Sequence, residues 1–187
     1  MFGKTQESSQ NENTPFNPRS SYGISKMTGF YLTKNYREAY KLHASSGILF
    51  NHESPRRNLD SVTRKISYGV ARIKKGLQKK ISLGNIKSCR DWGHSKDFVY
   101  AMWLMLQQDK PDDYVIGTGE KHSVQDFADK AFAHVGLDYK NFIDLDKNLI
   151  RSVESDNRVA DCTKAQKILK WRPKFSFDEL VADMVES

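Results

Sequence analysis

Apolar residues recur every three or four positions in several stretches of the chain, a spacing that predicts amphipathic helices. It predicts helices over residues 21–40, 62–75, 95–108 and 123–135, a short helix over 163–169 and a last helix after Ser176. Ser123 and Ser176 each precede an acidic residue by three positions, which is the spacing of a capping box at a helix start. Short apolar runs over 44–50, 80–84 and 113–117 predict buried strands. Strands that alternate with helices indicate an α/β fold.

The first twenty residues are polar and rich in Asn, Ser, Pro and Thr, which predicts an irregular surface loop. A dinucleotide-binding unit needs a glycine-rich turn between its first strand and its first helix. The local candidate is Gly117-Thr118-Gly119, but His122 stands where the third glycine belongs, and the turn follows a late strand. We therefore predict no phosphate-binding turn there.

The 187 residues are 38% hydrophobic and 11% aromatic, as in a soluble globular protein. No apolar run approaches the roughly 18 residues that cross a bilayer, and the first residues do not form a secretory signal. Cys89 and Cys162 lack the spacing of metal ligands and form no disulfide framework. These features predict a protein of the reducing cytoplasm with neither a metal site nor a membrane partner.

The net charge of +7 is concentrated in one stretch of the chain. Between Ser61 and Lys96 there are ten Lys or Arg residues and one acid, Asp91. Such a stretch can contact nucleic acid or the phosphates of a nucleotide, and it can equally be a solvated helix face. No nucleic-acid-binding motif accompanies it, so nucleic acid is not an expected partner.

Lys26 follows Tyr22 by four positions at the start of the first predicted helix. This spacing places the two side chains on one helix face. A nearby ammonium stabilises a phenolate, so that the tyrosine can accept a proton from a sugar hydroxyl. Such a pair also occurs by chance on the surface of many helices. The functional interpretation therefore depends on the sequence segments around the pair.

Several segments around this pair resemble those of one family. Pro18 to Lys26 is similar to the active-site segment of extended short-chain dehydrogenases. The run Gly47-Ile48-Leu49-Phe50-Asn51-His52-Glu53-Ser54-Pro55-Arg56-Arg57 resembles the signature of GDP-mannose 4,6-dehydratases. Residues 84–99, 1–3, 11–16 and 103–108 also resemble that family, so the resemblance spans nearly the whole chain.

The resemblance implies a lyase that uses NADP to convert GDP-mannose to GDP-4-keto-6-deoxymannose, on the route to GDP-fucose. It implies that Tyr22 takes the C4 hydroxyl proton and that Lys26 binds the nicotinamide ribose. His52 and Arg57 are then expected to contact NADP, at its carboxamide and its adenosine phosphate end respectively. The implied substrate contacts are Asn51, Lys65, Arg90, Arg151 and Glu154.

The fold that the resemblance implies is the C-terminal part of an NAD(P)-binding Rossmann fold plus a small α/β substrate-binding domain. Residues 1–60 are expected to belong to the cofactor domain, with helix 95–108 packing back on it. Residues 61–187 are expected to form mainly the nucleotide-sugar domain. In the family, the residues directly before Met1 include the glutamate that takes the C5 proton, so we expect a truncated, incomplete enzyme.

Two departures from the family pattern concern the site. Residues 58–61 replace the usual Gly-Glu-Thr-Phe after the paired arginines, and residues 151–156 lose a usual proline. Three other interpretations stay open. Arg56 or Arg57 can be a subunit-interface residue, and the enzyme can act on another nucleotide sugar. The chain can also be a non-catalytic fragment that binds a GDP-sugar, forms a homo-oligomer or pairs with a missing N-terminal half.

Overall fold

The computed structural model describes residues 1–5, 7–150 and 158–187. The helices lie where the apolar spacing predicts them. They are α1 (Ser21–Tyr40), α2 (Val62–Lys74), α3 (Ser95–Leu106), α4 (Val124–His134), α5 (Thr163–Ile168) and α6 (Phe177–Glu186), with short 3-10 turns η1 (Tyr139–Asn141) and η2 (Lys147–Leu149). Both predicted capping boxes are present, at Ser123 with Asp126 and at Ser176 with Glu179.

The three predicted strands are also present, together with five others of two or three residues. The strands are β1 (Ser46–Leu49), β2 (Asn51–Glu53), β3 (Ile81–Leu83), β4 (Cys89–Arg90), β5 (Trp92–His94), β6 (Asp113–Ile116), β7 (His122–Ser123) and β8 (Ile143–Leu145). Within the described residues, the pairs β1–β6, β2–β5 and β3–β8 are parallel, and β4–β7 is antiparallel. The chain therefore has the expected α/β fold.

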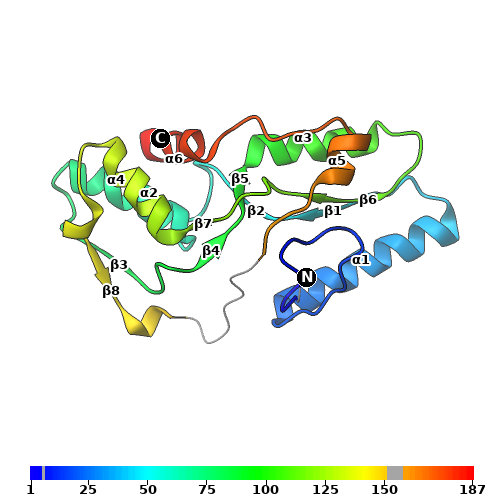
Figure 1. Ribbon diagram of the computed structural model, residues 1–187, viewed down its shortest axis with the longest axis horizontal. Helices are drawn as coiled ribbons and strands as arrows, with labels where there is room; N and C mark the ends of the chain where they lie inside the picture. Colours follow the sequence, from blue (N-terminus) through cyan, green and yellow to red (C-terminus); the bar gives the residue numbers. More distant parts are fainter. Residues whose placement is uncertain (6, 151–157) are drawn as a thin grey trace.

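The elements form two lobes with separate hydrophobic cores (Figure 1). In the first lobe, the β1–β6 pair lies between α1 and α3. Its core draws on segments far apart in the sequence, including Phe2, Ile48, Phe98, Ile116 and Trp171. Parallel strands need cover on both faces, and the two helices supply part of it.

The second lobe is built on three helices, α2, α4 and α6, which pack against one another. Ile66 and Val70 of α2, Phe127 of α4, and Leu180 and Met184 of α6 are at most 1% exposed in its core. The assignment of this lobe to the nucleotide sugar, and of the first lobe to the cofactor, stays a prediction.

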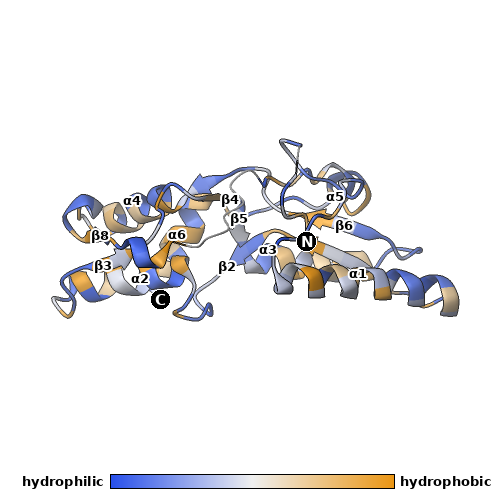
Figure 2. Cartoon of the chain, turned by 90° about the horizontal axis from the view of Figure 1, so that it is seen from below, coloured by the Kyte–Doolittle hydropathy of each residue, from blue (hydrophilic) through white to orange (hydrophobic). Residues whose placement is uncertain are grey.

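Helix α1 positions the tyrosine–lysine pair but buries little of itself. Ser20 caps it by accepting a hydrogen bond from the Gly23 amide, and the helix ends at Lys41, whose φ is 56°. Gly23 is the single fully buried residue of this helix. Apolar residues recur along its whole length (Figure 2). Those that are at least half exposed are Tyr22, Ile24, Tyr31, Leu32, Tyr36 and Tyr40. Apolar exposure on this scale is typical of a surface that binds another protein surface.

The prediction that residues 1–20 form a surface loop is only partly right. The segment is irregular, but Phe2, Gln10 and Thr14 are buried. The backbone of Gln10 exchanges hydrogen bonds with Val159 and Asp161, and its side-chain oxygen accepts from the Val159 amide. A distant part of the chain therefore covers the loop, which polar composition alone does not indicate. In the described residues, no helix combines the length and apolar character needed to cross a membrane.

Candidate functional site

Tyr22 and Lys26 lie together on the first turns of α1, as their spacing predicts. The Lys26 ammonium nitrogen lies 5.3 Å from the centre of the Tyr22 ring, and the Tyr22 side chain is 70% exposed. A Cβ on Gly23 would come within 3.1 Å of the Pro18 Cβ, so the glycine lets the preceding loop approach the helix start. The phenol of the pair is therefore open to a ligand.

His52 is held by two contacts on the short strand β2. Its Nδ1 lies 3.0 Å from the Phe50 carbonyl oxygen, and its ring stacks on Phe98 with centroids 4.8 Å apart. A carbonyl accepts only, so we infer that Nδ1 carries the hydrogen. In the neutral form of this tautomer Nε2 is an acceptor, which suits a carboxamide N–H donor.

Glu53 follows His52 and is buried, with 2% exposure. Its Oε2 accepts a 2.8 Å hydrogen bond from the Thr63 hydroxyl and a longer one, 3.4 Å, from Ser61. The same oxygen lies 3.3 Å from Nε of Arg57, whose side chain is 47% exposed. Burial raises the pKa of Glu53, and the hydroxyls and the Arg57 charge only partly offset this. No role was assigned to Glu53 from the sequence, although this residue lies inside the signature segment.

The other predicted contacts are distributed over several elements. Asn51 is exposed at the start of β2, and Lys65 is half-buried near the start of α2. Arg90 on β4 is half-buried, and its Nη1 donates to the Ser88 hydroxyl at 2.7 Å and to the Cys89 carbonyl at 2.6 Å. The predicted contacts Arg151 and Glu154 lie outside the described residues.

The structure therefore joins some of the predicted residues but not all of them. His52 and Arg57 share one segment that Glu53 ties to the start of α2. In the described part of the chain, no hydrogen bond or ion pair links Tyr22 or Lys26 to His52 or Arg57. A ligand that contacts both groups would have to bridge α1 and β2.

Asp91 is a second residue that the sequence did not single out. It is 1% exposed at the junction of β4 and β5. Its Oδ1 accepts from the Thr118 amide at 2.8 Å and the Thr118 hydroxyl at 2.7 Å. Its Oδ2 accepts from the amides of Gly119 at 3.0 Å and Ala160 at 3.1 Å. Four donors surround one buried carboxylate, which joins three segments distant in sequence.

These bonds also explain why Gly117-Thr118-Gly119 is not a phosphate-binding turn. The amides that a phosphate would need already donate to Asp91. The Gly117 amide donates to the sulfur of Cys162, and the Cys162 thiol donates to the Gly117 carbonyl. Burial raises the pKa of that thiol to about 12, so Cys162 is a packing residue and not a nucleophile.

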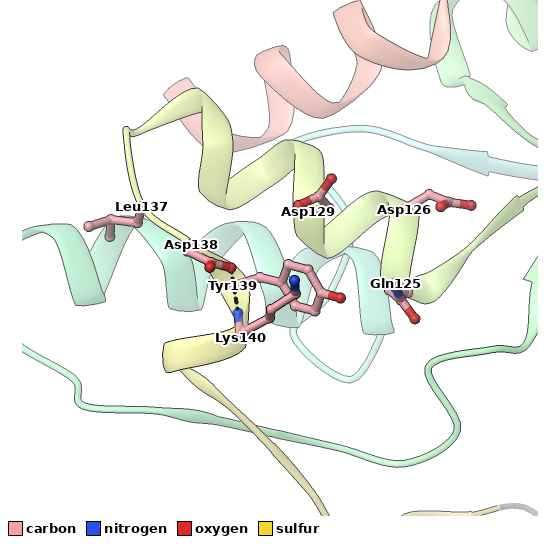
Figure 3. Close-up of a pocket in the computed structure, with 7 residues that line it drawn as sticks. All are labelled: Gln125, Asp126, Asp129, Leu137, Asp138, Tyr139 and Lys140. Atoms are coloured by element: carbon pink, nitrogen blue, oxygen red, sulfur yellow. Dashed lines mark hydrogen bonds between the residues drawn. The ribbon is translucent and has the colours of Figure 1, made fainter.

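Two surface hollows lie away from these residues. One, between α4 and η1, is lined by Gln125, Asp126, Asp129, Leu137, Asp138, Tyr139 and Lys140 (Figure 3). Two of its acids serve the backbone, because Asp126 completes the cap of α4 and Asp138 accepts from the Lys140 amide. The other hollow runs along the N-terminal loop and is lined by Lys4, Thr5, Glu7, Thr14, Pro15 and Asn17.

Comparison with known proteins places these features in a family. A family model described as GDP-mannose 4,6 dehydratase matches residues 1–184. GDP-mannose 4,6 dehydratase 1 of Arabidopsis thaliana is 54% identical over 186 residues, which cover 100% of this chain and 51% of the relative. GDP-mannose 4,6 dehydratase of Homo sapiens is 48% identical over 204 residues, covering 100% of this chain and 55% of the relative. The chain thus spans about half the length of these relatives.

Among solved structures, RMD from Pseudomonas aeruginosa complexed with NADPH superimposes with a TM-score of 0.90 at 18% identity. The match covers 99% of this chain and 62% of that one, and it shows a shared fold. The structural match shows the fold alone, whereas the family model matches nearly the whole sequence and therefore also shows the family. This chain belongs to the GDP-mannose 4,6-dehydratase family.

Proposed function

We propose that this chain carries part of the active site of an NADP-dependent lyase that dehydrates GDP-mannose to GDP-4-keto-6-deoxymannose. The observation that supports it most directly is the Tyr22–Lys26 pair, exposed at the start of α1 with the ammonium beside the phenol ring. A module that only binds a nucleotide sugar needs neither residue.

Tyr22 is the proposed base of the first step. Its phenolate oxygen accepts the proton of the C4 hydroxyl of the mannose ring, and the positive charge of Lys26 stabilises that phenolate. The exposure of Tyr22 allows a ring hydroxyl to reach it directly. Lys26 is proposed also to hydrogen-bond the nicotinamide ribose.

The residues of β2 and the following loop have the chemistry to hold NADP. Nε2 of His52 is an acceptor for the carboxamide, and the guanidinium of Arg57 is a donor for the phosphate at the adenosine end. NADP, when bound, supplies the hydride acceptor for the oxidation at C4. The part of this chain is to bind and orient the cofactor and to hold the proton at Tyr22.

Arg90, Arg151 and Lys65 are proposed to bind the diphosphate, with Asn51 beside it and Glu154 on the guanosine. Arginine suits this work because its planar fork binds phosphate through two bonds. The downstream formation of GDP-fucose and a cytoplasmic location belong to the same proposal.

The test is the Tyr22→Phe substitution in the longer protein or complex that shows activity. Phenylalanine removes the proton acceptor with little change in shape, so turnover of GDP-mannose should fall by roughly 100-fold or more. Tyr31→Phe, on the same helix and also exposed, is the matched control and should leave turnover unchanged. Near-normal turnover by Tyr22→Phe would exclude the assignment.

A second candidate function is a non-catalytic fragment that pairs with another chain, either a copy of itself or a nucleotide-binding half. The exposed apolar residues of α1 favour it. Sedimentation of Tyr31→Lys beside the unchanged chain discriminates the two proposals. An oligomer of the unchanged chain that is lost in Tyr31→Lys would support pairing through α1, and a monomer in both cases would contradict it.

A further inference from the structure

The segment that connects β2 to α2 carries the paired arginines, and it is fixed at both ends by one buried side chain. Glu53 lies at the end of β2, and its Oε2 accepts from the hydroxyl of Thr63 in the first turn of α2. Ser61, the residue that precedes α2, donates to the same oxygen. The Ser95 hydroxyl holds the Glu53 carbonyl from α3. Glu53 is therefore anchored through its side chain by Ser61 and Thr63 and through its backbone by Ser95.

Arg57 forms an ion pair with this anchored carboxylate, with Nε as its nearest nitrogen, and among the described residues its guanidinium donates no side-chain hydrogen bond. The Nε–Oε2 distance is 3.3 Å, whereas the Arg57 side chain as a whole is 47% exposed. In the described part of the chain, Arg57 makes no second ion pair. A guanidinium binds a phosphate through two parallel bonds from one edge. Pairing at Nε leaves the edge formed by Nη1 and Nη2 available for such an anion.

We propose that Glu53 is a positioning residue that holds Arg57 by its Nε, so that the Nη1–Nη2 edge is presented to a phosphate group of the nucleotide cofactor. The inference rests on the proposed function for the identity of the anion, but not for the contact itself. A flexible arginine loses side-chain entropy when it binds, and a carboxylate that fixes it beforehand reduces that cost. Arg56, its neighbour, is exposed and has no such partner among the described residues.

The arrangement depends on the charge of Glu53. Among the described residues, the titratable groups that face it are Arg57 and His52. Ser61 and Thr63 donate hydroxyls to its carboxylate, and Ser95 of α3 donates to its backbone carbonyl. Because burial raises the pKa of Glu53, this carboxyl takes up its proton at a higher pH than an ordinary glutamate does. Acidification should therefore release Arg57 before the surface carboxylates titrate.

The first measurement needs no ligand. Exchange of the Arg57 Nε–H with water is followed by NMR in the 187-residue chain, with the Nε–H of Arg56 as the internal reference. Glu53→Gln keeps the volume and the ability to accept from Thr63 but removes the charge. It should speed Arg57 exchange relative to Arg56 by roughly five- to tenfold, the effect of losing one partly exposed ion pair beside Nε. Thr63→Val disturbs the same pocket, keeps the carboxylate and should leave the ratio near its original value.

The second measurement uses adenosine 2′,5′-bisphosphate, a piece of the cofactor, in a chemical-shift titration that detects millimolar affinity. Arg57→Ala and Glu53→Gln should each weaken binding, by roughly three- to tenfold. If Arg57→Ala has no effect, the proposed cofactor role of Arg57 fails, while the exchange ratio still decides the positioning role. An exchange ratio unchanged by Glu53→Gln overturns the inference. If that variant does not fold, lowering the pH of the unchanged chain through the Glu53 titration must raise the ratio, and a flat ratio overturns it too.

Discussion

Arg37 and Asp113 form a two-bonded ion pair that joins the end of α1 to the start of β6. Nη1 donates to Oδ1 at 2.9 Å and Nη2 donates to Oδ2 at 2.7 Å, and both side chains are largely buried. Arg37 also donates to the Ala44 carbonyl, and Asp113 accepts from the Ser46 amide at the start of β1. The pair therefore sets the position of α1, and with it Tyr22, against the β1–β6 strands.

Asp113→Ala should destabilise the chain by about 2–4 kcal/mol, because it leaves the Arg37 charge half-buried without its partner. Asp144→Ala removes an exposed ion pair with Lys80 and should cost less than about 1 kcal/mol. Urea unfolding of both variants measures the difference. Equal midpoints for the two would contradict the structural role of the Arg37–Asp113 pair.

The same pair predicts an acid-dependent loss of stability. Burial alone would raise the pKa of Asp113, but hydrogen bonds from Arg37 and Ser46 and the Arg37 charge outweigh it, so the pKa is lowered. A lowered carboxyl pKa stabilises the fold above the unfolded value of about 3.9, and that stability is lost as the pH falls through the folded-state pKa. Unfolding free energies measured from pH 6 downward should fall less steeply in Asp113→Ala. If the unfolding free energies of the variant and the unchanged chain fall in parallel with pH, the Asp113 carboxylate does not contribute to the acid-dependent loss of stability.

Asp91→Asn should be more damaging than its small size suggests. The substitution keeps the shape but turns one acceptor oxygen into an NH₂ group that faces N–H donors of the Thr118, Gly119 and Ala160 segments. The expected cost is about 2–4 kcal/mol, because buried donors lose their acceptor. Asp129→Asn, at an exposed position of α4, is the matched control. Thermal unfolding of the two variants checks it, and a melting temperature of Asp91→Asn equal to that of the control would contradict it.

Arg90→Ala should weaken the binding of GDP. A charge-assisted bond to phosphate contributes about 1.5–3 kcal/mol, which corresponds to roughly 10- to 150-fold in the dissociation constant. Titration calorimetry of GDP measures it, with Arg172→Ala, at an exposed position after α5, as the control. Because Arg90 also bonds Ser88 and Cys89, the fold of the variant must first be checked by circular dichroism. Equal constants for Arg90→Ala and unchanged chain exclude a direct contact with the diphosphate.

The 187-residue chain by itself should not bind NADP with micromolar affinity or form the 4-keto-6-deoxy product. Pyrophosphate binding in this fold depends on a glycine-rich turn and the helix N-terminus behind it. The turn at Gly117 to Gly119 cannot serve, because its amides are taken by Asp91 and Cys162. Fluorescence titration and product analysis test this, and micromolar binding together with product formation would overturn it.

The long elements were predictable from the sequence because apolar spacing and helix caps are local. The bounds of α1 agree with the predicted residues 21–40, and the Ser123 capping box is present. The strands β2, β4, β5, β7 and β8 were not predicted, because they have only two or three residues and their sequences form no distinct apolar run such as the one that marks β3. Their pairing is fixed by partners far away along the chain.

The candidate site also has features that were predictable from local sequence and features that were not. The contact of Tyr22 with Lys26 followed from their spacing on one helix. The roles of Glu53 and Asp91 were missed because their local sequence does not show which donors surround the two carboxylates in the fold. Glu53 gains its importance from Thr63 and Arg57 in a folded loop, and Asp91 from amides that lie 27 or more residues away. Contacts of this kind depend on how the segments assemble.

The composition of the two cores has a consequence for synthesis on the ribosome. The first lobe needs Phe2 and Trp171 in the same core, and the second needs Ile66 together with Met184. Neither core can form until nearly the whole chain has emerged. The apolar segments that emerge first therefore stay exposed until the later segments are made. Contacts between distant segments form slowly, and exposed apolar segments aggregate in the meantime. We expect the nascent chain to depend on chaperones, and a stop codon before residue 171 to leave both lobes unfolded.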